Sequence, residues 1–137
     1  SNLKTWLNQY RMLNDTIDIL DPYIINLGIE FVVSTLPSAN VDTVIQQCIS
    51  RLQKTYSSGF YIGEHFQISD IYSELKQIRE VLDVTNVKVS NKIGINYSNV
   101  KFSVNKNLSP AGNRILCPKN AIFEIKYFKT DIKGKTR

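Results

Sequence analysis

The sequence predicts an α+β domain: a mixed or antiparallel sheet with two amphipathic helices packed on one face, plus an N-terminal helix. Three observations support this fold class. One stretch alternates apolar and other residues, two later stretches have apolar residues at helical spacing, and the second half is strand-like and rich in turn residues. With 137 residues, 42% of them apolar and 21% charged, the chain has the length and composition of one globular domain.

Residues 23–33 are predicted to form the strand on which the rest of the chain packs. Every odd position in this stretch is apolar: Tyr23, Ile25, Leu27, Ile29, Phe31 and Val33. Asn26, Gly28 and Glu30 lie between them, on the face that the alternation assigns to the other side of the sheet. Pro22 precedes the stretch, and because proline has no N–H group it fixes where the strand begins.

Two later stretches have the spacing of helices that bury one face. The first follows a predicted N-cap at Asn40, and its apolar positions are Val41, Val44, Ile45, Cys48, Ile49, Leu52 and Tyr56. Gly59 is expected to end this helix in a left-handed conformation, and residues 60–66 are expected to be extended. The second helix is predicted to begin at the N-cap Ser69, with the apolar stripe Ile71, Leu75, Ile78 and Leu82.

A helix is also predicted over residues 3–13, from the stripe Leu3, Trp6, Leu7, Tyr10 and Leu13. Trp6 and Tyr10 are the large aromatic residues that we expect at an interface with another subunit, and the domain's own core is the alternative location for both. The chain begins without a methionine, close to this helix, so we expect it to be a fragment of a longer polypeptide.

Beyond residue 90, Lys, Asn and Ser separate short alternating pieces. Residues 87–89 alternate as a strand does. The pieces at 100–104 and 123–127 predict two or three antiparallel strands, one of them an edge strand protected by Lys101 and Lys126. Residues 130–137 are expected to be a connector or a frayed end. The predicted organisation is one domain over residues 1–137, with a helix and strand core at 1–90 and a basic, strand-rich extension at 91–137.

The charge is distributed unevenly along the chain. Residues 1–83 hold six Lys and Arg against ten Asp and Glu, whereas residues 84–137 hold eleven against two, for a net +5 in total. This asymmetry favours an acidic partner for the second half, either nucleic acid or an acidic protein surface. No apolar run approaches the roughly 20 residues of a membrane-spanning helix, so no membrane partner is expected.

We expect no catalytic residues, no cofactor and no metal. His65 is the one histidine, and on a strand its neighbour Glu64 would point to the opposite face, so a partly exposed loop histidine is favoured over a catalytic one. Asp15, Asp18 and Asp21 lack the other ligands and the closing glutamate of a calcium loop, which favours capping and turn roles. No glycine-rich phosphate-binding motif occurs.

The two cysteines have no paired spacing. Cys48 is expected to be a reduced core residue on the apolar face of a helix, and Cys117 a loop residue before Pro118. A disulfide between them is the less favoured alternative.

Aromatic and basic residues alternate in the second half. The aromatic residues are Tyr97, Phe102, Phe123, Tyr127 and Phe128, and the basic ones are Lys101, Lys126 and Lys129. Such a set on a sheet can stack bases and hold phosphates. The alternation favours the other arrangement, with the aromatic rings in the core and the lysines in solvent.

Two segments carry a resemblance to a known family. They are residues 21–25 (Asp-Pro-Tyr-Ile-Ile) and residues 61–72 (Tyr-Ile-Gly-Glu-His-Phe-Gln-Ile-Ser-Asp-Ile-Tyr), and the positions that match the family pattern are Gly63, Ser69, Ile71, Tyr72, Leu75 and Ile78. Over about residues 3–90 the chain resembles the C-terminal part of baseplate J-like proteins, and more closely the large baseplate wedge subunit of T-even-type contractile-tailed phages. Many members have Gly-Val where the second helix meets the last strand, whereas this chain has Asp83-Val84, so that junction is expected to turn differently.

The resemblance implies a viral structural protein of the phage tail, located in the baseplate of the virion and assembled in the host cytoplasm. It implies association with copies of itself, as a homo-oligomer, and with other baseplate wedge subunits in the ring around the tail hub. We therefore expect a non-enzymatic assembly module that acts through protein–protein contacts. The alternative is a basic nucleic-acid-binding module that uses the second half, and a small enzyme comes third.

Overall fold

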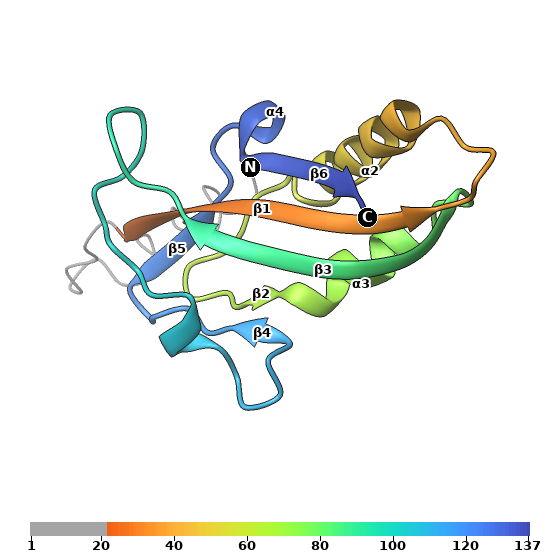
Figure 1. The fold of residues 1–137 in the computed structure, drawn as a ribbon. Helices are drawn as coiled ribbons and strands as arrows, with labels where there is room; N and C mark the ends of the chain where they lie inside the picture. Colours follow the sequence, from red (N-terminus) through yellow and green to blue (C-terminus); the bar gives the residue numbers. More distant parts are fainter. Residues whose placement is uncertain (1–21) are drawn as a thin grey trace, which may run out of the picture.

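The computed structural model describes residues 22–137, which form a four-stranded mixed sheet with helices on one face and a separate two-stranded piece (Figure 1). The elements in chain order are β1 (Tyr23–Thr35), α2 (Val41–Thr55), β2 (Phe66–Gln67), α3 (Ile68–Lys76), β3 (Val81–Asn91), the 3-10 helix η1 (Asn105–Asn107), β4 (Arg114–Ile115), β5 (Ala121–Glu124), α4 (Phe128–Asp131) and β6 (Ile132–Thr136). The predicted α+β class is confirmed. The helix predicted over residues 3–13, with Trp6 and Tyr10, lies outside the described residues.

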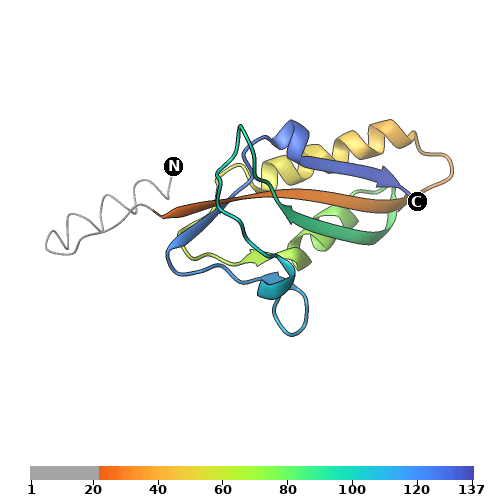
Figure 2. The ribbon, with the colours of Figure 1, turned by 60° about the vertical axis from the view of Figure 1, so that its left-hand side comes forward.

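Strand β1 is the centre of the sheet. β3 pairs with it antiparallel along one edge, from Leu27 to Thr35. Two short parallel strands share the other edge, β5 beside Tyr23–Asn26 and β6 beside Ile29–Val33. A strand of 13 residues is long enough for two short partners to follow one another along the same edge. Figure 2 shows β6 running beside β1 towards the C-terminus.

The face of β1 towards the helices is apolar, as the alternation predicts. Five odd positions, Ile25, Leu27, Ile29, Phe31 and Val33, are 0–2% exposed. Tyr23 was predicted to share this face, and that prediction is wrong, because its side chain is 59% exposed. It is the first residue of the strand, where β5 begins to pair with β1, and so it lies at the end of the sheet and not within it.

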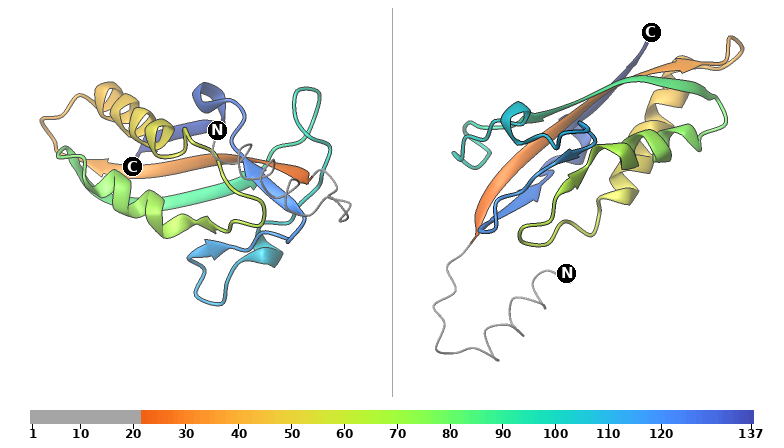
Figure 3. Two further views of the ribbon diagram at one scale, coloured as in Figure 1. Left: turned by 180° about the vertical axis from the view of Figure 1, so that it is seen from behind. Right: turned by 90° about the horizontal axis from the view of Figure 1, so that it is seen from below.

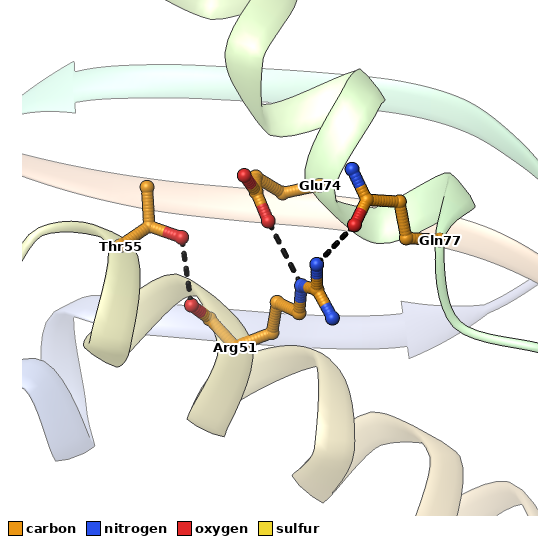
Figure 4. Close-up of polar contacts among 4 residues, drawn as sticks. All are labelled: Arg51, Thr55, Glu74 and Gln77. Carbon is orange, nitrogen blue, oxygen red and sulfur yellow. Dashed lines mark hydrogen bonds and ion pairs between the residues drawn. The ribbon is translucent and has the colours of Figure 1, made fainter.

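Helices α2 and α3 lie on the same side of the sheet (Figure 3), α2 against β6 and α3 against β3. Asn40 caps α2 as predicted, since its side-chain oxygen accepts a hydrogen bond from the Thr43 N–H group at 3.1 Å. Arg51 joins the two helices (Figure 4): its Nε donates to a Glu74 carboxylate oxygen at 2.8 Å, and its guanidinium also donates to Gln77.

Helix α3 differs from its prediction at both ends. Gln67 and not Ser69 precedes its first residue, and the N–H groups of Ile68 and Ser69 donate to the Asn113 carbonyl, so a distant loop replaces the predicted side-chain cap. The helix ends at Lys76, and Leu82, predicted to lie on its buried stripe, belongs to β3 and is 59% exposed. Local spacing could not show either difference, because both follow from pairing with residues far away in the sequence.

The second half joins the sheet in a way that its pattern did not predict. Residues 100–104 form no strand, and β5 and β6 pair parallel with β1 instead of forming antiparallel hairpins. Lys101 and Lys126 lie outside the strands and protect no edge. The expectation of a connector or frayed end over residues 130–137 is wrong, because β6 occupies most of it and Ile132 is fully buried.

Candidate interaction surface

The one histidine has a structural contact. His65 is half-buried in the segment before β2, and its Nδ1 accepts a hydrogen bond from the Cys117 N–H group at 2.8 Å. This position agrees with the predicted loop histidine. Within residues 22–137, no group of three His, Cys, Asp or Glu side chains is placed to hold a metal ion.

Both cysteines are buried and carry free thiols, as predicted for Cys48. Burial raises the pKa of each thiol to about 11. The Cys117 thiol also donates to the Ala121 carbonyl at 3.4 Å. Because the thiolate is the reactive form, neither side chain is suited to act as a nucleophile at neutral pH.

The outer face of β1, opposite the helices, is closed along its first half. Asn26 is 1% exposed and its amide makes two short hydrogen bonds, one donated to Glu124 and one accepted from the Ser98 N–H group, both at 2.7 Å. Lys92 lies over Gly28, where an added Cβ would come within 2.5 Å of the lysine Cε. Residues 92–100 therefore cover this half of the face (Figure 2).

A buried carboxylate holds the covering segment in place. Asp131 is 3% exposed and accepts hydrogen bonds from the Tyr97 hydroxyl at 2.7 Å and from the Tyr127 N–H group at 3.2 Å. The bond to Asp131 raises the pKa of Tyr97. At the tip of the same segment, Ile93 is 46% exposed and Ile95 fully exposed, so two apolar side chains are presented on a well-anchored loop.

The second half of the outer face is open and charged. In the strand register, Glu30 of β1 lies directly between Lys88 of β3 and Lys133 of β6. Val32, the next residue of β1 on this face, lies between Asn86 and Lys135. Directly opposed residues in paired strands point to the same face. We call this surface the lysine face, and its six residues are Glu30, Val32, Asn86, Lys88, Lys133 and Lys135. All except Val32 are exposed, and they line a groove of about 440 Å³.

The lysine face contains none of the basic residues that the sequence indicated. Lys101, Lys126 and Lys129 are exposed in other parts of the fold. Two of the face's lysines, Lys133 and Lys135, lie in the segment that was expected to fray. Lys133 and Lys135 alternate with Ile132 and Gly134, and this alternation is the one pattern that could have indicated a strand. It is not apparent in the sequence because glycine has no apolar side chain.

The aromatic residues of the second half mostly face inwards, as the favoured arrangement predicts. Phe123 is 1% exposed and packs edge-to-face with the half-buried Phe102 at a centroid distance of 5.5 Å. Tyr127 is the exception, since its side chain is 39% exposed and its ring lies edge-to-face with Tyr97.

A second, mostly apolar cleft of about 620 Å³ lies between β5, the start of β1 and the end of α2. Its lining includes Pro22, Ile24, Phe60, Ile122 and Phe128. Its polar lining residues are Tyr56, Ser57, Ser58 and Glu124, and the buried Tyr56 hydroxyl has no hydrogen-bond partner among the described residues.

No protein-family model matches the chain, and comparisons with characterised proteins and with solved structures found no match. Within residues 22–137, none of the helices has the length and apolar character needed to cross a membrane.

Proposed function

We propose that this chain is a structural assembly module of a phage tail baseplate wedge, acting through protein–protein contacts and not as an enzyme. The lysine face carries the proposal, because it is an exposed sheet face with charges of both signs in a regular array. The resemblance of residues 3–90 to baseplate J-like proteins supports the baseplate as its location. The proposed partners are copies of the same chain and other wedge subunits, in the virion's tail.

A charged, open face is suited to fixing how subunits meet. Complementary charges across an interface steer association and set its orientation, while like charges exclude wrong partners. Lys88, Lys133 and Lys135 surround Glu30, so the face selects a partner rich in acidic groups but not uniformly acidic. The exposed Ile95 supplies an apolar contact elsewhere on the surface, of the kind that stable interfaces also bury.

Binding of nucleic acid is the second candidate, because three lysines on one face attract phosphates. Two features weigh against it. None of the six residues of the lysine face is aromatic, and Phe31, which also lines the groove, is 1% exposed, so bases have nothing to stack on. Glu30 at the centre of the face repels a polyanion. Sub-micromolar binding of DNA that survives at about 0.15 M salt would favour this candidate over the first.

Analytical ultracentrifugation tests the assembly proposal. We expect the chain to self-associate weakly between about 10 µM and about 1 mM, and added salt to loosen the association. K133E/K135E should abolish it, whereas K101E/K106E, which makes the same change of charge at exposed lysines away from the sheet, should not. A strict monomer under all conditions would contradict self-association and leave only contacts with other wedge subunits.

A further inference from the structure

We infer that the lysine face binds an extended, acidic segment of a partner polypeptide. The inference rests on the proposed function and specifies the chemistry of the partner at that surface. It follows from the spacing of the lysines, from the position of Glu30 and from the shape of the groove.

The spacing of the basic residues along β6 matches that of an extended chain. Lys133 and Lys135 point to the same face two residues apart, which in a strand is roughly 6.6 Å. Alternate side chains of any extended segment repeat at the same distance. A segment lying along β6 with an acidic residue at every second position would therefore place one carboxylate near each lysine.

The charge pattern across the strands favours a polypeptide over a nucleic acid. Neighbouring strands lie about 4.8 Å apart, so Lys88, Glu30 and Lys133 form a row of alternating sign roughly 10 Å long. A polypeptide can place acidic groups against the two lysines of this row and a hydroxyl or N–H donor over Glu30. A sugar-phosphate backbone has only negative charges to offer and no donor for the carboxylate.

The groove has an apolar floor and a charged rim. The half-buried Val32 lies between the exposed side chains of Asn86 and Lys135, so the floor is apolar there while the rim is polar and charged. The groove's volume of about 440 Å³ is small for a folded domain to enter and is suited to a few side chains of a single segment.

Fluorescence anisotropy with two labelled probes tests the inference: a short peptide of alternating Glu and Ser residues, and an oligothymidylate of equal charge. We expect the peptide to bind more tightly than the oligonucleotide. K133E/K135E should weaken peptide binding about tenfold or more, because several exposed charge pairs are lost or reversed together. The matched variant K101E/K106E should change it less than about twofold. E30Q should strengthen oligonucleotide binding more than peptide binding.

Three results would overturn the inference. These are no peptide binding up to about 1 mM, equal losses in both double variants, and tighter binding of the oligonucleotide. Denaturation curves of each variant check that it is folded. If the peptide fails to bind while salt-sensitive self-association persists, only the partner's chemistry is wrong. If the peptide binds and the chain is a strict monomer, self-association alone is contradicted.

Discussion

The two faces of β1 have different roles, although both come from one stretch of sequence in which apolar and other residues alternate. Towards the helices, Ile29 and Phe31 are 0–1% exposed and belong to the core, whereas Glu30 between them is exposed among lysines of the neighbouring strands. Burial of apolar area stabilises the fold, while exposed charge pairs contribute little to stability. The face that contributes least to folding is therefore the one free to bind a partner.

The largest expected effect on stability comes from a substitution on the buried face. Ile29→Ala should lower the free energy of unfolding by roughly 2–5 kcal/mol, because it removes buried methyl groups and leaves a cavity. Ile95→Ala, the same substitution at a fully exposed position, should lower it by less than about 0.5 kcal/mol. Urea denaturation measures both, and similar losses would show that the assignment of the buried face is wrong.

Overpacking the same face is expected to cost somewhat less. At Gly134, an added Cβ would lie 2.1 Å from the ring of Phe31, which is 1% exposed. Gly134→Ala should therefore destabilise the protein by about 1–3 kcal/mol. A double-mutant cycle with Phe31→Leu, which replaces the ring with a smaller side chain, tests this. In that background, Gly134→Ala should lower the free energy of unfolding by less than it does alone. An unchanged cost would mean that Phe31 and Gly134 do not share this space.

The closed half of the outer face gives a smaller, polar effect. Tyr97→Phe leaves a buried oxygen of Asp131 without its donor and should cost about 1–2 kcal/mol. Because the bond raises the pKa of Tyr97 above the ordinary value of 10.0, its contribution is complete below about pH 10 and is lost as the pH rises through the raised pKa. The difference between wild type and variant should therefore shrink in alkaline denaturation series. Tyr61→Phe, at a 47% exposed tyrosine, is the control.

The smallest effect is expected on the exposed face of β1. Glu30→Ala removes an exposed side chain and should change the free energy of unfolding by well under about 1 kcal/mol. Urea denaturation of Glu30→Ala and Ile29→Ala compares the two losses directly, since the two residues are adjacent and point to opposite faces. Equal effects at the two positions would contradict the facing of β1.

Much of the first half could be predicted because its determinants are local. The alternation over residues 23–33 predicted a strand with a buried and a polar face, and the stripe after Asn40 predicted α2 with its cap and the buried Cys48. Side chains at period two or at helical spacing point to one face whatever surrounds them. These features needed no knowledge of the rest of the chain.

The candidate site could not be predicted, because it exists only through pairing. Alternation shows which residues of a strand share a face but not which strand lies beside it, so nothing in residues 132–136 indicated that Lys133 would lie next to Glu30, or Lys88 on its other side. The strand β6 itself was missed because Gly134 interrupts its apolar alternation. That glycine leaves space on the buried face for the ring of Phe31, a residue about a hundred positions earlier. The faces of the longest strand and helix follow from local spacing in the sequence, whereas the pairing of the strands, and therefore which charges lie side by side, follows from contacts between distant segments.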